Sequence, residues 1–322
     1  MSFLSLLAAR GAAVVTPSPD PVTPPPGPAF PSSVPYNVDT FITDITDPYG
    51  HAGSVVHPDV LDFGEAGWNG HRYWMAATPY YQDGFRDENP CLWWSDGDPT
   101  KWTEAVKNPL YPPPVNTNQW NADTELIHDP VTDEIAVLFL GPGGLFQVAR
   151  SSDGVTWPQA TETFRPTGYA GIVCPVVLRV GSEWWMWAWD TISKGFLLWK
   201  SNSLSTGWSE PLSVPRPPMG CWHMNIVQRD GRMYMLFNST ATPGEMYTGT
   251  STDGVNWVWG TKPVIQTRTA RPGKWDNEQL YRSALTFHEN GTHMRVWYPG
   301  RGTGSDSWRL GHTVIPLTEW PV

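Results

Sequence analysis

Apolar runs of roughly four to eight residues, separated by short clusters of Gly, Pro, Asn, Asp and Ser, extend along most of the chain. No long stretch shows helical periodicity, and runs rich in Val, Ile, Trp, Phe and Tyr are typical of β-strands. Three polar turns have related sequences: WSDGDPTKW at 94–102, SSDGVTW at 151–157 and STDGVNW at 251–257. The pattern predicts an all-β fold built from repeated antiparallel units.

Five such units follow one another, each made of three apolar runs. Their first runs open at His57, Asp123, Cys174, His223 and Arg282. A period of roughly 50–60 residues is typical of propeller blades, which stack radially because one small sheet cannot bury both faces alone. We therefore predict a five-bladed β-propeller over residues 36–322, in which a strand near 39–45 completes the last blade beside the C-terminal strand.

The S-x-D-G-x-x-W turns resemble the Asp-box turn of sialidase-type propellers. In such a turn Asp accepts local hydrogen bonds, Gly supplies a positive φ, and Trp packs back on the strands. We interpret these turns as structural and assign no chemistry to them.

The N-terminal segment differs from the rest because residues 16–35 are dominated by proline, which favours an extended arm with few backbone donors. We predict that residues 1–35 form an arm that docks on another subunit of a larger assembly; the alternative is a strap on its own propeller. The first fifteen residues have no Lys or Arg before Arg10, so we expect no secretion signal.

Composition excludes several classes of partner. The net charge is −10 and no basic run is present, so we expect no nucleic-acid partner. No apolar run reaches 18 residues, so we expect no membrane partner. Three widely spaced cysteines form no zinc motif and leave open a Cys174–Cys221 disulfide.

The first strand of each predicted blade carries polar residues at alternate positions, which places them on one side of the strand, facing the axis. When the five first strands are aligned at their opening residues, these opening residues form the first column of the alignment. The third column, two residues further along each strand, is formed by Asp59, Glu125, Val176, Asn225 and Ala284. Buried charges are costly unless they are paired or bind a ligand. Two interpretations therefore stay open, a self-neutralised plug or a ligand pocket.

The polar ring and its neighbours supply the candidate site residues. Aromatic rings beside carboxylates and amides are typical of sugar sites, because rings stack on sugar C–H faces. We predict ligand-binding roles for His57, Trp120, Trp222, His223, Asn225, Tyr281 and Arg282. We predict no cofactor; the alternative is Ca²⁺ at the axis, near His57, Asp123 and His223.

The five-unit layout, with HPDV opening the first blade and DNEQLYRSAL opening the last, resembles the five-bladed propellers of the glycoside hydrolase family 43 kind. More narrowly, it resembles tail-associated (minor tail) proteins from phages of actinobacteria. The hydrolase resemblance implies an inverting mechanism with two carboxyl groups. It makes Asp59 the base, Asp123 or Glu125 a tuning acid, and Glu278 or Glu88 a replacement for the general acid that the later first strands lack.

We therefore predict a glycan-binding propeller of a phage virion, located in the tail or otherwise extracellular. Its expected partners are host-surface carbohydrate and, through the arm, other tail proteins. The alternatives are an active glycosidase of the arabinan or arabinogalactan type and a purely structural tail propeller.

Overall fold

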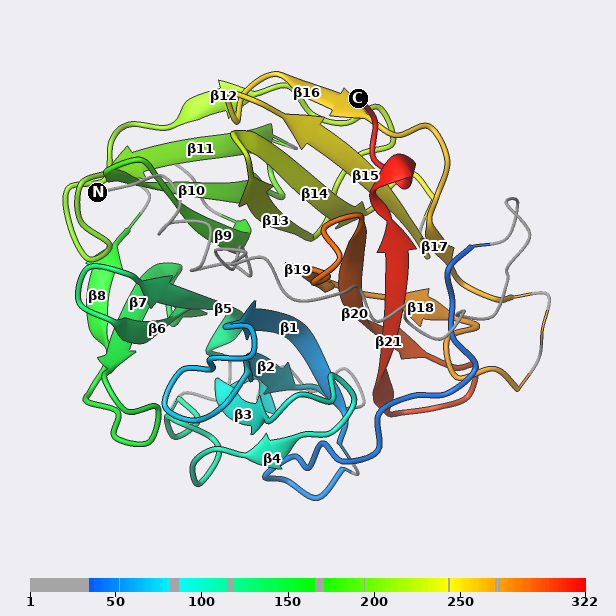
Figure 1. The fold of residues 1–322 in the computed structure, drawn as a ribbon, viewed down its shortest axis with the longest axis horizontal. Coiled ribbons are helices and arrows are strands. Elements are labelled where there is room, and N and C mark those ends of the chain that lie inside the picture. Colours follow the sequence, from blue (N-terminus) through cyan, green and yellow to red (C-terminus); the bar gives the residue numbers. More distant parts are fainter. Residues whose placement is uncertain are drawn as a thin grey trace.

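The computed structural model describes residues 35–51, 53–81, 87–114, 119–165, 171–193, 195–242, 244–269, 271 and 273–322. They form five antiparallel sheets arranged around one axis (Figure 1). The first three blades contain β1 (Val55–Asp62), β2 (Tyr73–Pro79), β3 (Cys91–Ser95) and β4 (Thr103–Glu104); β5 (Ala122–Asp129), β6 (Glu134–Gly141), β7 (Leu145–Ser151) and β8 (Thr161–Phe164); and β9 (Ile172–Val180), β10 (Glu183–Asp190), β11 (Gly195–Ser201) and β12 (Leu212–Val214). The last two contain β13 (Met224–Arg229), β14 (Arg232–Asn238), β15 (Glu245–Ser251), β16 (Trp257–Trp259) and β17 (Ile265–Gln266); and β18 (Gln279–Leu280), β19 (Ala284–Phe287), β20 (His293–Arg301) and β21 (Trp308–Pro316), followed by the short 3-10 helix η2 (Leu317–Glu319).

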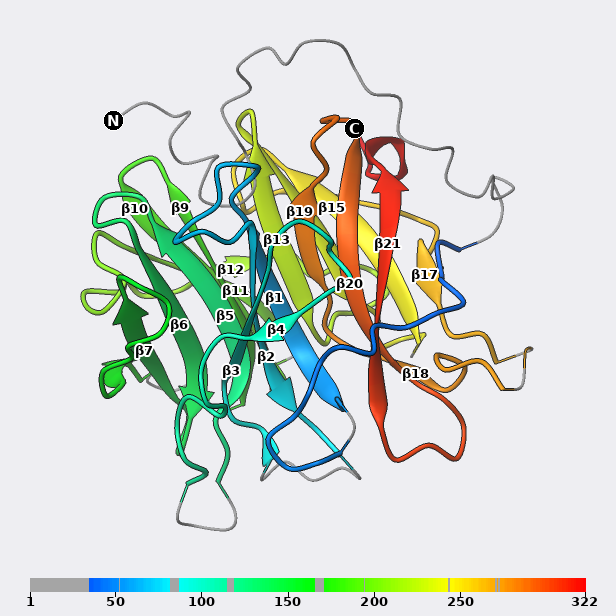
Figure 2. The same cartoon turned by 60° about the horizontal axis from the view of Figure 1, so that its bottom comes forward.

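The innermost strands β1, β5, β9, β13 and β19 meet at the axis. Each contacts the inner strand of the next blade, and β19 contacts β1, so the ring is closed (Figures 1 and 2). The predicted five-bladed propeller and its inner strands are confirmed. Within the described part of the chain, no helix is long and apolar enough to span a membrane.

Each hydrophobic core lies between two neighbouring blades. One core packs Trp187 of β10 with Trp257 of β16, and the core that joins the last blade to the first packs Trp93 of β3 with Trp297 of β20. Because each sheet buries both faces against its neighbours, the blades stabilise one another.

The two copies that are most similar in sequence, SSDGVTW and STDGVNW, form the same hydrogen bonds, described here for the second copy. Gly254 N donates to Ser251 Oγ at 2.9 Å, two amides donate to Asp253 Oδ1, and Trp257 Nε1 donates to Gly254 O at 3.1 Å. Gly254 has φ +74°, and a Cβ there would lie 2.7 Å from Trp187 of the preceding blade. The turn is therefore a docking element between blades, as its resemblance to the Asp-box predicts.

Closure of the last blade differs from the prediction. Residues 39–45 form no strand, and the segment makes one backbone hydrogen bond to β21, from Ile42 N to Leu310 O at 2.8 Å. At the start of this segment, Asp39 Oδ1 accepts from Arg268 Nη1 at 2.5 Å and from Lys274 Nζ at 2.8 Å, both in the connection before β18.

Two further predictions concern the N-terminal arm and the cysteines. Apart from Pro35, the Pro-rich arm lies outside the described residues, so its docking role stays a prediction. Cys91, Cys174 and Cys221 are buried and free, so the Cys174–Cys221 disulfide is not formed. The Cys174 thiol instead donates to Met224 O at 3.2 Å.

Candidate functional site

The N-terminal ends of the first three inner strands share an unusual backbone feature. His57, Asp123 and Cys174 have φ values of 53°, 55° and 54°, and strand pairing shifts by a bulge beside each of them. Bulges redirect side chains, and left-handed conformations of non-glycine residues concentrate at functional sites. The repeated bulge therefore sets how the opening residues are presented at the axis.

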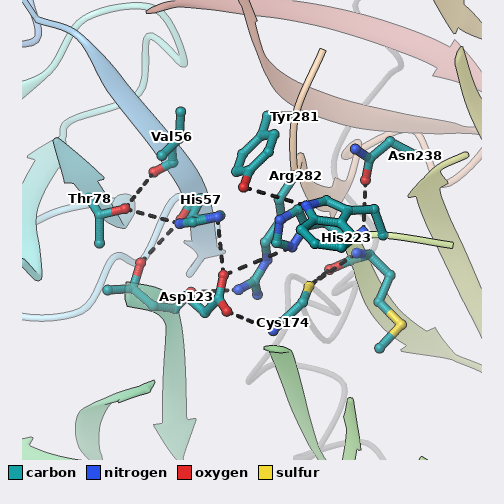
Figure 3. A network of polar contacts seen from close by, with 12 residues as sticks. Val56, His57, Thr78, Asp123, Cys174, His223, Asn238, Tyr281 and Arg282 are labelled. Carbon is teal, nitrogen blue, oxygen red and sulfur yellow. Dashed lines mark hydrogen bonds and ion pairs between the residues drawn. The ribbon is translucent and has the colours of Figure 1, made fainter. Parts of the chain in front are cut away.

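Three of the opening residues form a compact group at the axis, which we call the axial cluster: His57, Asp123 and His223 (Figure 3). Asp123 Oδ1 lies 3.1 Å from His57 Nε2 and 3.9 Å from His223 Nδ1. One ligand atom from each residue lies within 4.8 Å of the other two. The three side chains come from three different blades and are 2%, 3% and 2% exposed, so the fold delivers them to a buried point.

The facing atoms of the axial cluster make no hydrogen bonds with any described residue. Within that part of the chain, His57 Nε2, Asp123 Oδ1 and His223 Nδ1 are all buried and without a hydrogen-bond partner. The 3.1 Å between His57 Nε2 and Asp123 Oδ1 is short enough for a hydrogen bond, so it is their alignment that prevents one. Orphaned buried polar atoms are costly, and three that converge on one point indicate a missing ligand between them.

Other polar atoms of the cluster residues are held from outside, except His223 Nε2, which is also buried and has no hydrogen-bond partner among the described residues. Asp123 Oδ2 accepts a hydrogen bond from Cys174 N at 2.9 Å, and His223 N donates to Asn238 Oδ1 at 2.9 Å. His57 Nδ1 lies 3.1 Å from Thr78 Oγ1. These contacts leave the inward-facing atoms available.

Burial favours the neutral form of both imidazoles. Burial lowers the pKa of His57 to about 4, although Asp123 opposes the shift, and burial lowers the pKa of His223 well below its usual value. Two neutral imidazoles and a carboxylate suit Zn²⁺ and related divalent transition metals, and three protein ligands leave a coordination position for substrate. Ca²⁺ prefers oxygen ligands, so this donor set does not favour the Ca²⁺ alternative.

Glu88 lies beside the axial cluster. Its Oε2 is 3.6 Å from His57 Nδ1, and its side chain is nearly buried. Burial, assisted by the charge of Asp123, raises the pKa of Glu88 well above its usual value. A carboxyl group that is easily protonated beside a ligand cluster is suited to acid–base chemistry.

The polar residues of the third column, together with Arg282 of the first, form a separate layer at the axis, which we call the lower network: Asp59, Glu125, Asn225 and Arg282. Asp59 accepts from Leu126 N at 2.6 Å and from Asn225 Nδ2 at 3.0 Å. All four residues of this network are at most 1% exposed.

Arg282 pairs with Glu125, one of the two carboxylates of the lower network. Its guanidinium forms an ion pair with Glu125 Oε2 and donates to Thr124 O at 3.0 Å, while Glu125 Oε1 accepts from Val177 N at 2.8 Å. The structure thus contains both arrangements that the sequence left open: paired charges in the lower network and converging orphan atoms in the axial cluster. Asp59 and Glu125, the base and tuning acid implied by the hydrolase resemblance, belong to the paired layer.

The remaining candidates lie around the cluster or outside it. The Tyr281 ring centroid is 4.4 Å from that of His223 and 5.0 Å from that of His57, and Trp222 Nε1 lies 3.5 Å from Tyr281 Oη. Trp120 is 39% exposed, at the start of the second blade. Glu278 is exposed and lies 3.7 Å from Arg301, so it is not among the buried acids of the axis.

Sequence reasoning missed Thr78 and Asn238 and gave Glu88 only a substitute role. Thr78 and Asn238 lie on second strands, where a single polar residue at the end of an apolar run carries no distinguishing signal. Glu88 lies in the connection before β3. Glu88 was recognisable only as an acid in the segment DENP.

The chain is similar to carbohydrate-active propeller proteins. It is 26% identical over 312 residues to the A type blood N-acetyl-α-D-galactosamine deacetylase of Flavonifractor plautii, an alignment that covers 76% of this chain and 40% of that protein. It therefore spans less than half of the length of this curated relative. No family model matches the chain.

Solved structures show the same fold. The crystal structure of an N-acetylgalactosamine deacetylase from F. plautii, in complex with blood group B trisaccharide, superposes with a TM-score of 0.74 at 22% identity, covering 89% of this chain and 95% of that one. The catalytic domain of the Coprinopsis cinerea GH62 α-L-arabinofuranosidase gives a TM-score of 0.61 at 14% identity, covering 90% and 99%. A thermostable family-43 glycoside hydrolase gives 0.57 at 12% identity, covering 80% and 88%. The chain is thus a five-bladed β-propeller similar to family-43-like enzymes and to a deacetylase.

Proposed function

We propose that this propeller is a metal-dependent hydrolase that removes the acetyl group from an N-acetylated sugar. The observation that carries the proposal is the convergence of His57, Asp123 and His223, whose ligand atoms lie within 4.8 Å of one another and whose facing atoms are buried without partners. The similarity to the F. plautii N-acetylgalactosamine deacetylase supports an amide of an amino sugar as the substrate class.

A divalent cation bound by these three residues would polarise the amide carbonyl and lower the pKa of a water molecule. Glu88, whose Oε2 lies 3.6 Å from His57 Nδ1 and whose pKa is raised by burial, is the residue that we assign to take the proton of that water. Water would add to the carbonyl carbon, the C–N bond would break, and Glu88 would return the proton to the leaving nitrogen. The products are acetate and a free amino sugar.

The glycosidase alternative has weaker support from the site. An inverting glycosidase needs two carboxyl groups that face each other across room for sugar and water. Asp59 and Glu125 instead hydrogen-bond to backbone amides, and Glu125 pairs with Arg282. The nearest acids that are not in the lower network, Glu88 and Asp123, flank a histidine.

Glycan binding without cleavage remains the second candidate function. It is supported by Trp222 and Tyr281, which are half-buried beside the cluster, and by the exposed Trp120. Placement in a phage tail or elsewhere outside the cell is a prediction from the sequence that fits this binding role.

The test is acetate release from oligosaccharides that end in N-acetylgalactosamine or N-acetylglucosamine, with protein supplied with Zn²⁺, Mn²⁺ or Co²⁺ and with protein treated with a chelator. We expect metal-dependent release that Glu88→Gln reduces by at least about 100-fold, whereas the exposed Glu278→Gln leaves it unchanged. Binding of these glycans without acetate release under any metal would favour the second candidate. Release of reducing sugar in place of acetate would favour the glycosidase.

A further inference from the structure

The hydroxyl of Thr78 contacts the ring of His57 from the side opposite the axial cluster. Thr78 lies near the end of β2 and is fully buried. Its Oγ1 is 3.1 Å from His57 Nδ1 and 3.4 Å from the carbonyl oxygen of Val56 (Figure 3). The hydroxyl therefore bridges a ring nitrogen and a backbone acceptor.

The two neighbours of the hydroxyl fix the direction of its proton. A threonine hydroxyl has one proton to donate and lone pairs to accept. A carbonyl oxygen only accepts, so the proton points to Val56 O and the lone pair is left for a donor on His57 Nδ1. Glu88 Oε2 lies 3.6 Å from the same nitrogen, too far for a hydrogen bond, so Thr78 makes the hydrogen-bond contact of Nδ1.

The opposite tautomer is disfavoured at Nδ1. Nδ1 would then have to accept the Thr78 proton, which would leave Val56 O without that donor. A proton on Nε2 would lie 3.1 Å from Asp123 Oδ1 but without the alignment of a hydrogen bond, so no hydrogen bond holds it there. The contacts of Nδ1 thus favour the proton on Nδ1, which leaves the lone pair of Nε2 directed into the cluster.

We propose that Thr78 is a positioning residue that holds His57 in the tautomer able to bind a metal ion through Nε2. The inference rests on the proposed metal site and extends it to a residue on a second strand. Partners of this kind orient metal-binding histidines, and their loss typically weakens metal affinity about 10–100-fold.

The variant test measures the dissociation constant of Zn²⁺ for the full chain by competition with a chromophoric chelator. Thr78→Val keeps the shape of the side chain but removes the hydroxyl, so we expect affinity to fall about 10–100-fold. Thr78→Ser keeps the hydroxyl group and should restore the Zn²⁺ affinity. Thr286→Val is the matched control, because Thr286 is equally buried on an inner strand and its Oγ1 has no partner.

A second measurement reads the tautomer of His57 directly in the wild-type protein. Long-range ¹H–¹⁵N spectra of metal-free protein labelled at histidine, assigned with His57→Gln, report which nitrogen carries the proton. We expect the Nδ1–H form for His57.

The outcomes separate the two proposals. If the wild-type protein binds no Zn²⁺, the proposed function fails. If it binds Zn²⁺ but Thr78→Val binds equally well, or if His57 carries its proton on Nε2, the role of Thr78 is overturned while the metal site stands.

Discussion

Replacing Arg282 by methionine would leave the Glu125 carboxylate buried without its cationic partner. Both side chains have no measurable exposure, and Arg282 also donates to Thr124 O at 3.0 Å. Removing one partner of a buried ion pair typically costs about 3–5 kcal/mol, because the remaining charge stays desolvated. We therefore expect Arg282→Met to lower the free energy of unfolding by that amount.

The assay is equilibrium unfolding in urea, analysed by the midpoint and the slope. The double variant Arg282→Met/Glu125→Gln tests the reason for the loss. The glutamine side chain keeps an acceptor for Val177 N but carries no charge, so the double variant should be at least about 1 kcal/mol more stable than Arg282→Met alone. A loss below about 1 kcal/mol for Arg282→Met, or a double variant less stable than Arg282→Met, would refute the view that the lower network is a charge-paired structural plug.

Three further predictions use the same structure. Gly254→Ala should lower the free energy of unfolding by about 2 kcal/mol more than Gly231→Ala. Both positions have positive φ, but only at Gly254 would the added Cβ contact Trp187. Equal losses for the two variants would contradict the docking role of the turn. The pKa of His312 is lowered to about 3 by burial and by nearby Arg295. As the pH falls, His312 is therefore protonated at a higher pH in the unfolded chain than in the folded protein. The free energy of unfolding should therefore fall as the pH drops below about 6.5, by up to ~1.4 kcal/mol per pH unit for this group, and His312→Gln should flatten the dependence measured by urea titration. Trp222→Ala should weaken glycan affinity about tenfold in calorimetry, a loss of ~1.4 kcal/mol, and unchanged affinity would exclude the ring from the sugar site.

The fold could be predicted from the sequence because the repeated turn requires particular residue types that few other residues can replace. Asp253, Gly254 and Trp257 each satisfy a separate requirement of one turn, so their recurrence identifies the blade boundary. The apolar runs between these turns then fix the order of the strands. That residues 39–45 form no strand was not accessible, because the segment is held by contacts with residues far away in the sequence, such as that of Asp39 with Arg268.

The site was accessible only in part. Alternation along the inner strands indicated that His57 and Asp59 both face the axis, and the structure places them there, in separate layers. The division between layers depends on which residues lie at the bulges and on Arg282 reaching Glu125 across the axis. Neither feature has a local signal in the sequence.

The most direct test of the central claim is anomalous diffraction from crystals of the protein grown with Zn²⁺. We predict an anomalous peak at the axis about 2.0–2.2 Å from His57 Nε2, Asp123 Oδ1 and His223 Nδ1. A fully occupied zinc elsewhere, or no peak among these three atoms, would contradict it.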